Sequence, residues 1–438
     1  MKSLLIALAL LQAPTDSLPD LSRPWDLARC TQWALEHNLS VAQQKTAVQS
    51  RTIEKNTADW SWVPNVNASA SQNFSFGRGL GGNNTYESGN TSTTGFNLSS
   101  GMTLFDGLAT PRRIQLAKLN LDAAMEDLEK AKDDVSVSVA RAYVQILYNY
   151  EICDVAKEQL AIDSLQVVRL EGLYGSGKAS AAEVSQQKAS LAQSRLSLVQ
   201  AQNNVRNSLL ELAQLLEFPA WEGFAIVRPA VSVDDLYLSS PDDIYADALG
   251  LRPAIRAEQI RLEGSAKQVQ IAKSAFLPSL SLSGGLGTNY YSSSFNSNSF
   301  WNQLSNNFSQ YVGLSLSIPI FNRMSTRNQV RSAQVNLQNQ QIQLRRVQQN
   351  LYKEIQQAWN GAVAARFKWE ASVSAQDAAR DAFVLQQAKY ENGKATITEF
   401  NEARNRLVKA QSDLVQANYE YLFQSRLLEF YRGGALTL

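Results

Sequence analysis

Apolar and polar residues alternate strictly in the segment "FLPSLSLSGGLG", which covers residues 276–287. After the proline, Leu280, Leu282 and Leu286 fall on one side, whereas serine and glycine residues fall on the other. A period of two residues is typical of a β-strand with one apolar and one polar face. The same alternation predicts strands at about residues 65–76, 94–105, 279–290 and 311–321. Each is about ten residues long, which is the length of a tilted strand that crosses a membrane.

A second pattern repeats apolar residues every seven positions. The first series is Ile114, Leu121, Leu128, Val135 and Ala142, and the second is Val330, Leu337, Leu344, Leu351 and Ala358. A sustained seven-residue repeat is typical of helices that pack side by side in a left-handed coil. It predicts long helices at about 111–172 and 325–389, followed by return helices at about 181–216 and 398–432. At 1.5 Å per residue the long helices would reach roughly 100 Å, which indicates a span rather than a globular core.

The chain is written twice. The segment "LYGSGKASAAEV" (173–184) matches "KYENGKATITEF" (389–400) at an offset of 216 residues, and the two heptad series are also 216 residues apart. Between the strands the offset is 214, as Pro64 and Pro278 show. We therefore divide the chain into a first repeat, residues 18–228, and a second repeat, residues 229–438.

The strands raise a problem of closure. Four strands do not close a barrel, and an open sheet edge in lipid leaves backbone groups without hydrogen bonds. At least two copies of the chain must then contribute strands, with the leucines facing lipid and the serines lining a shared pore. We expect the aromatic residues near the strand ends to lie at the lipid interface; these are Tyr290, Tyr291, Trp301 and Tyr311. The alternative is a pair of hairpins packed on a soluble core.

Charge and the N-terminus narrow the class of protein. The 41 basic and 40 acidic residues nearly cancel and form no basic stripe, which argues against nucleic acid as a partner. Residues 1–17, "MKSLLIALALLQAPTDS", are typical of a secretory signal peptide, although Pro14 leaves the cleavage point open. No later apolar run approaches the roughly 20 residues of a membrane helix. The two cysteines, Cys30 and Cys153, are predicted to be buried thiols; lipid attachment at Cys30 is the alternative.

Catalytic chemistry has little support. The segment "GLYGSGKA" (172–179) fits a phosphate-binding loop until Ala179, where serine or threonine is required, and it joins two predicted helices rather than a strand and a helix. His37 is the only histidine, which leaves little for metal clusters or catalytic triads. We therefore expect neither an enzyme nor a cofactor or metal site.

The duplicated chain, with strands between helices and a Tyr-x-x-Gly turn in each half, resembles the TolC-type outer membrane factors. The turns pair Tyr174 with Gly177 and Tyr390 with Gly393. The resemblance implies a mainly α fold with membrane β structure: long coiled-coil helices form an α-helical barrel, and four strands per chain contribute to a 12-stranded antiparallel β-barrel in a homotrimer. The location implied is the bacterial outer membrane, with a large periplasmic portion. The segment at 217–240 would help to form a band around the middle of the tunnel.

The resemblance also implies a function and partners. Such proteins are passive exit ducts of a tripartite efflux pump or a type I secretion system. They dock to a periplasmic adaptor, also called a membrane fusion protein, and to an energised inner-membrane transporter. A periplasmic coiled-coil scaffold without a pore is the alternative function. The exported substrate is not encoded in any feature of the sequence, because the partners of such ducts select it.

Two groups of site residues follow from the resemblance. The turns would lie at the periplasmic tips and dock the adaptor through Tyr174, Gly177, Gly393 and Glu183. The pore gate would consist of Glu399 and Glu402, three residues apart on one helix face, with Tyr390 and Lys394 nearby. The alternative for the glutamates is an exposed helical patch.

The gate would be electronegative, because three copies would place six carboxylates around one opening and their mutual repulsion would raise some of their pKa values. Two departures from the family limit the prediction. Gln186 takes the place of the second glutamate in the first repeat, and Ala395 stands where the best-known member has an arginine that locks the closed tip. Lys394, next to it, would substitute only loosely.

Overall fold

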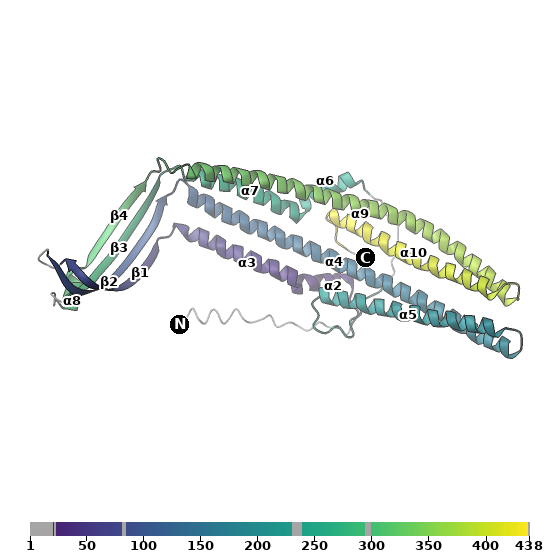
Figure 1. The fold of residues 1–438 in the computed structure, drawn as a ribbon. Helices are drawn as coiled ribbons and strands as arrows, with labels where there is room; N and C mark the ends of the chain where they lie inside the picture. The colour runs from purple at the N-terminus through teal and green to yellow at the C-terminus, as the bar shows by residue number, and fades with distance from the viewer. Residues whose placement is uncertain (1–20, 22, 81–84, 230–238, 294–298, 437–438) are drawn as a thin grey trace. The chain divides into compact units, whose positions relative to one another are not determined.

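The computed structural model describes residues 21, 23–80, 85–229, 239–293 and 299–436 (Figure 1). The predicted signal peptide, residues 1–17, lies outside the described residues. The described chain forms two compact units. The first comprises the residues up to Thr46 together with Asp127–Ile255 and Val347–Leu438, and the second comprises Ala47–Glu126 and Arg256–Arg346. Several long helices contribute residues to both units, so each unit is built from segments of both sequence repeats.

The helices fall into pairs of equal length. Helix α4 (Ala109–Gly175) and helix α9 (Ser325–Glu391) have 67 residues each, and the return helices α5 (Ala181–Leu215) and α10 (Ile397–Tyr431) have 35 each. Every one of these boundaries is shifted by 216 residues between the halves, since 325 − 109, 391 − 175, 397 − 181 and 431 − 215 give the same number. The two hairpins, α4–α5 and α9–α10, are therefore copies in length as well as in heptad phase (Figure 1).

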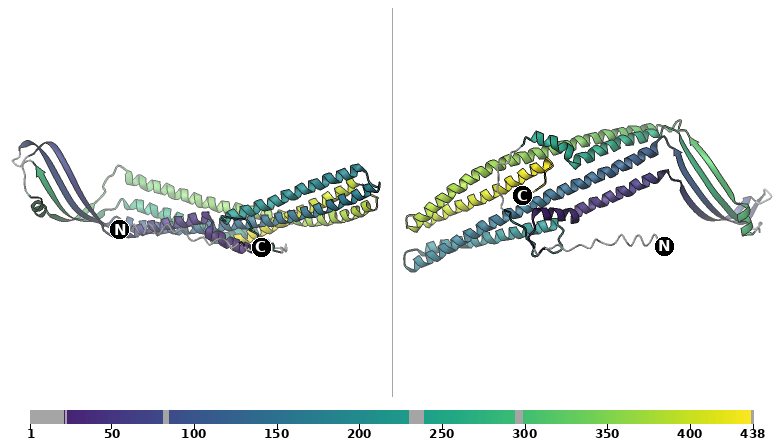
Figure 2. Two further views of the ribbon diagram at one scale, coloured as in Figure 1. Left: turned by 90° about the horizontal axis from the view of Figure 1, so that it is seen from below. Right: turned by 180° about the vertical axis from the view of Figure 1, so that it is seen from behind.

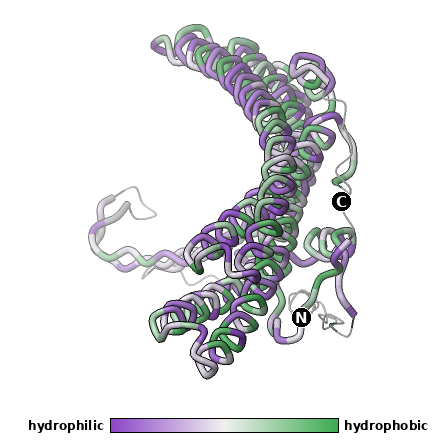
Figure 3. Tube along the Cα trace, turned by 90° about the vertical axis from the view of Figure 1, so that its right-hand side faces the viewer, coloured by the Kyte–Doolittle hydropathy of each residue, from purple (hydrophilic) through white to green (hydrophobic). Residues whose placement is uncertain are grey.

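Shorter helices complete the chain. They are α2 (Leu27–His37), α3 (Leu39–Asp59), the 3₁₀ helix η1 (Trp60–Trp62), α6 (Pro241–Leu251), α7 (Pro253–Ser274) and α8 (Phe300–Asn306). Along the helices in Figure 3, hydrophilic and hydrophobic turns alternate, which agrees with narrow apolar seams rather than uniformly apolar helices. Among the residues that the structure describes, no helix is both long enough and apolar enough to cross a membrane.

Four antiparallel strands form one sheet in the order β1-β2-β3-β4. They are β1 (Asn65–Leu80), β2 (Tyr86–Phe105), β3 (Ser279–Ser293) and β4 (Ser309–Ser317). Strand β2 of the first repeat pairs with β3 of the second, so the sheet joins the two halves of the sequence. Figure 2 shows the four strands side by side in two further views. Strands β1, β2 and β3 extend beyond the segments expected from alternation, whereas β4 ends before Ile318, next to Pro319.

Register places the apolar residues of all four strands on one face. Leu98 pairs with Ala68 on one side and with Leu286 on the other, and Leu282 pairs with Leu314. Residues directly opposite each other in antiparallel strands point to the same face. Most of these side chains are half-buried or exposed in the single chain; Leu314, for example, is 68% exposed. The leucine face is thus an apolar surface that the chain does not cover itself.

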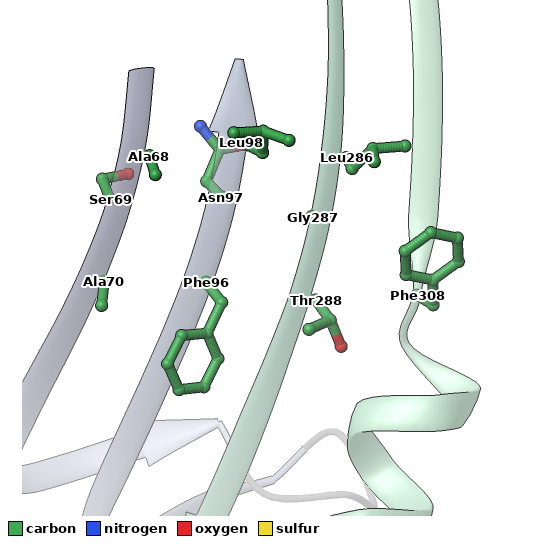
Figure 4. Close-up of a pocket in the computed structure, with 10 residues that line it drawn as sticks. All are labelled: Ala68, Ser69, Ala70, Phe96, Asn97, Leu98, Leu286, Gly287, Thr288 and Phe308. Atoms are coloured by element: carbon green, nitrogen blue, oxygen red, sulfur yellow. The ribbon is translucent and has the colours of Figure 1, made fainter. Parts of the chain in front are cut away.

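The leucine face is hollowed where small residues replace large ones. A hollow of about 510 Å³ lies over β1, β2 and β3, with Phe308 from the segment before β4 at its edge (Figure 4). Its floor includes Ala68, Ala70 and Gly287.

Tyr311 corrects one expectation. It pairs with Gly285, which pairs with Ser99, and so lies on the serine face rather than with the leucines. A Cβ atom on Gly285 would come within 2.7 Å of Tyr311 Cε1, so the ring lies directly over this glycine. The lipid-interface prediction is therefore wrong for Tyr311, because the period of two carries its side chain to the opposite face.

An aromatic core joins the N-terminal helices to the end of α5. The ring of Phe218 contacts those of Trp25, Trp33 and Phe224 at centroid distances of 5.1, 5.8 and 5.2 Å. Trp33 Nε1 donates a 3.0 Å hydrogen bond to the Leu216 carbonyl oxygen, near the end of α5, where helical carbonyls lack partners. Cys30 is fully buried in this core and burial raises the pKa of its thiol to about 12. Cys153 is buried as well, which agrees with two buried thiols and leaves no room for a lipid on Cys30.

Candidate functional site at the hairpin tips

Both hairpins turn through the same backbone motif. At the first tip, Gly177 N donates to Tyr174 O at 2.9 Å and Lys178 N donates to Leu173 O at 2.8 Å. At the second tip, Gly393 N donates to Tyr390 O at 3.0 Å and Lys394 N donates to Lys389 O at 2.8 Å. This pair of bonds defines a Schellman motif, which needs a left-handed residue after the helix. Gly177 has φ 71° and Gly393 has φ 69°, values that glycine adopts without strain.

The return helices begin with matching capping boxes. Ser180 Oγ accepts from Glu183 N at 3.2 Å, and Glu183 Oε2 accepts from Ser180 N at 2.7 Å. In the second repeat Thr396 and Glu399 make the same two bonds at 3.3 and 2.8 Å. Glu183, which was predicted to dock an adaptor, and Glu399, which was predicted to gate the pore, are thus both held by the backbone at a helix start.

This local role changes the electrostatics expected for the gate. Hydrogen bonds from the Thr396 backbone and hydroxyl hold the pKa of Glu399 below its usual range, and those from Ser180 do the same for Glu183. Repulsion in a ring was expected to raise some of these pKa values. In the single chain the direction is the opposite for Glu399, because a carboxylate that accepts backbone hydrogen bonds is favoured in its charged form.

Glu402 lies one turn further along α10. Its Oε1 pairs with Arg406 NH2 at 3.1 Å, and both side chains are exposed. Glu399 and Glu402 are therefore close in sequence and open to solvent, but each already has a local partner. Lys394 is exposed and Ala395 is half-buried at the same turn. The gate assigned to Glu399, Glu402, Tyr390 and Lys394 remains a prediction.

The two tip tyrosines differ in environment. Tyr174 is 53% exposed, whereas Tyr390 is half-buried and stacks on Phe400 at a centroid distance of 5.0 Å. The Arg169 guanidinium, from the first hairpin, lies 5.8 Å from the Tyr390 ring centre. Arg169 NH1 also lies 3.4 Å from Glu391 Oε1. The first hairpin thus contacts the second at its turn through Arg169, a residue that the sequence gave no reason to select.

A buried ion pair lies deeper between the hairpins. Asp163 of α4 is fully buried, and the side chain of Arg404, from α10, is 5% exposed; Arg404 NH1 donates to Asp163 Oδ1. Three further side chains donate to the same carboxylate. They are Gln187 at 3.0 Å, Gln159 at 2.9 Å, and Ser194. Apolar side chains from both hairpins, including Leu170, Val184 and Phe400, form a core cluster between the same helices.

Sequence reasoning missed this pair, although the heptad held a signal. Asp163 falls on the same seven-residue column as Val135 and Ala142, and Leu170 follows it. A charged residue in the column that faces the partner helix is a marker of a specific contact. Arg404 gave no comparable signal, because arginine on a helix usually indicates a solvated face.

Comparisons with known proteins agree with this architecture. The sequence model described as "Outer membrane efflux protein" matches residues 31–216 and 244–434, once in each half. The chain is 25% identical over 341 residues to the outer membrane efflux protein BepC of Brucella suis biovar 1, covering 77% of this chain and 71% of BepC. It is 23% identical to the outer membrane protein TolC of Escherichia coli K12, covering 78% of this chain and 71% of TolC.

A solved structure shows the same fold. The outer membrane protein VceC of Vibrio cholerae matches with a TM-score of 0.76 at 22% identity, covering 94% of this chain and 97% of VceC. The likeness confirms the predicted fold class, with long coiled-coil helices and four strands per chain that contribute to a trimeric barrel.

Proposed function

Because the chain belongs to the outer membrane efflux protein family, as the resemblance to TolC-type factors implied, we propose that it acts as the passive exit duct of a tripartite efflux pump or a type I secretion system. The relatives are outer membrane channels, and the chain is an efflux channel of the outer membrane with a large periplasmic helical portion. Channels of this family are trimeric and work with efflux pumps. The finer assignments below are proposals.

The sheet is the observation that carries the proposal. Its leucine face is exposed and its edge strands β1 and β4 have no further strand among the described residues. Such a sheet is unsuited to water on one face and to lipid at its edges, and both problems disappear when copies close a ring. A scaffold protein without a pore would have no need for leucines that segregate to one face through four strands.

We assign the adaptor contact to the hairpin tips. The support is that Tyr174, Gly177, Gly393 and Glu183 lie at or just after the two turns, and that Tyr174 is exposed. An energised inner-membrane transporter would act through that adaptor. The periplasmic opening would be formed by α10, with Glu399 and Glu402 as its charged residues and Tyr390 and Lys394 beside them.

Reconstitution tests the proposal directly. Purified protein should migrate as a trimer that dissociates on heating, and it should open ion-conducting pores in a planar lipid bilayer. A coiled-coil scaffold would give neither result. Assembled trimers that never conduct in the bilayer, even after the tips are removed by protease, would contradict the duct and support the scaffold.

A further inference from the structure

The buried ion pair distinguishes two hairpins that are otherwise copies of each other. Under the offset of 216, Asp163 corresponds to Ala379, Gln187 to Ala403, Ser194 to Ala410 and Gln159 to Ala375. The second hairpin therefore has alanine at every position where the first surrounds the carboxylate with donors. A helical hairpin of this length thus forms without the network, and the polar residues need another explanation.

The cationic side of the pair is equally one-sided. Arg404 of α10 corresponds to Lys188 of α5, since 404 − 216 is 188. Lys188 is exposed and pairs with Glu171 of its own hairpin at 2.7 Å. Arg404 instead leaves its own hairpin and enters the first one, where its side chain is almost completely buried. Only one of the two related positions is committed to a partner hairpin.

Within the chain, α10 meets α4. The Asp163–Arg404 pair lies between these helices, and Arg141 of α4 lies 5.5 Å from the ring centre of Phe423 on α10. Figure 1 shows α10 beside α4, while α5 and α9 lie at the outer edges of the two hairpins. In a closed trimer those edges must meet α9 and α5 of neighbouring copies, because a ring leaves no free side. Helices α5 and α9 are the repeat counterparts of α10 and α4, so the two kinds of interface are alike.

We propose that Asp163 and Arg404 act as a pairing determinant: they commit α10 to α4 and thereby force hairpins of the first and second kind to alternate around the ring. In the alternating ring, Arg404 faces Asp163, and Lys188 faces Ala379 while it keeps its bond to Glu171. If two second hairpins paired, Arg404 would be buried against Ala379 without a counter-charge. Every contact between two first hairpins forces such a contact elsewhere in the ring.

General physical chemistry favours a role in specificity over one in stability. Desolvation of two charges offsets most of their attraction, so a buried pair can often be replaced by apolar residues without loss of stability. Removal of one partner alone is strongly destabilising, because the other charge stays buried. A buried pair is therefore a weak source of stability and an effective means of excluding the wrong neighbour.

The test uses an apolar variant of the whole chain, Asp163→Leu with Gln187→Met and Arg404→Met. Pairing is read with Arg169→Cys and Glu391→Cys, two positions from different hairpins whose native side chains approach to 3.4 Å, and a short bis-thiol reagent. Both native cysteines are buried and stay unlabelled in the folded protein. A product within one chain migrates as a single chain after denaturation, whereas a product between chains migrates as a dimer or larger.

We expect products within one chain when Asp163 and Arg404 are present. The apolar variant should melt at the wild-type temperature or above it and should give at least five times more product between chains or more assemblies that are not trimers. Arg404→Met alone should reduce the trimer yield at least tenfold, and adding Asp163→Leu and Gln187→Met should restore assembly. Glu171→Leu with Lys188→Met, which removes the related exposed pair, should behave like the wild type.

Two results would overturn the proposal. If the apolar variant forms uniform trimers with wild-type cross-linking, the pair does not select the neighbour. If it fails to assemble at all while the Glu171→Leu/Lys188→Met control assembles, the pair is needed for stability and not for choice of partner.

Discussion

At the scale of single residues, the direction of a side chain on the sheet decides what a substitution does. Leu314 pairs with Leu282 on the leucine face, and Ser315 pairs with Ser281 on the serine face. We expect Leu314→Arg to lower the yield of membrane-assembled trimer severalfold, because a cation facing lipid costs about 2–4 kcal/mol near the bilayer midplane. Ser315→Arg is the matched control and should assemble nearly normally. Equal trimer yields on a semi-native gel would contradict the face assignment.

The capping boxes give a second prediction at this scale. Thr396→Ala removes the hydroxyl that accepts from Glu399 N, and loss of such a cap costs roughly 1 kcal/mol. Local opening at the second tip should therefore increase, as measured by hydrogen exchange over residues 396–400. Thr396→Ser keeps the hydroxyl and should exchange like the wild type. Unchanged protection in Thr396→Ala would mean that the cap does not limit opening.

The acidity of Glu399 gives this cap a pH dependence. Its pKa is lower in the folded chain than in the unfolded chain, because the Thr396 groups donate to the carboxylate. The contribution to stability is then fully present above the unfolded value, near pH 4.3, and is lost as the pH falls through the lower folded pKa. The exchange difference between Thr396→Ala and the wild type should accordingly persist at neutral pH and shrink only in strong acid.

At the scale of elements, the sequence was most informative where a pattern repeats. The heptads of α4 and α9 and the glycine turns are read from local spacing, and the fold class built on them is confirmed. The contacts between hairpins were not accessible in the same way. Arg169 and Arg404 look like ordinary surface arginines in the sequence, since their burial depends on a partner helix hundreds of residues away. Helix α8 was also missed, because its seven residues lie in a polar loop too short for a periodic signal.

The turns carry a prediction about elements. A Cβ on Gly177 or Gly393 would meet no atom within 4 Å, so substitution there causes backbone strain and no clash. A side chain in the left-handed region costs roughly 1–2 kcal/mol. We expect Gly177→Val with Gly393→Val to abolish transport and adaptor cross-linking while trimers remain in the membrane.

The control for the turns is Gly177→Asn with Gly393→Asn, because asparagine tolerates the left-handed region. It should retain most of the transport. Normal adaptor cross-linking by the valine variant would remove the tips from the docking surface.

At the scale of the whole molecule, the gate prediction depends on assembly. In the trimer, Glu399 and Glu402 should make the channel prefer cations, since rings of carboxylates favour them in pores. Because the pKa of Glu399 is held low, this preference should survive mild acidification. Glu399→Gln with Glu402→Gln should reduce cation selectivity and relieve block by multivalent cations from the periplasmic side. Wild-type block in that variant, recorded in a bilayer, would leave the pair as an ordinary solvated patch.

The equal hairpins have a consequence for how such a duct can change in length. Helices α4 and α9 match at 67 residues, and α5 and α10 match at 35. An insertion in one hairpin alone would stagger the two turns, and an insertion that is not a multiple of seven would rotate the apolar seam away from its neighbour. Length is therefore quantised: the duct can grow or shrink only by whole heptads, added to all four helices together. The duplication acts as a ruler that each half reads against the other.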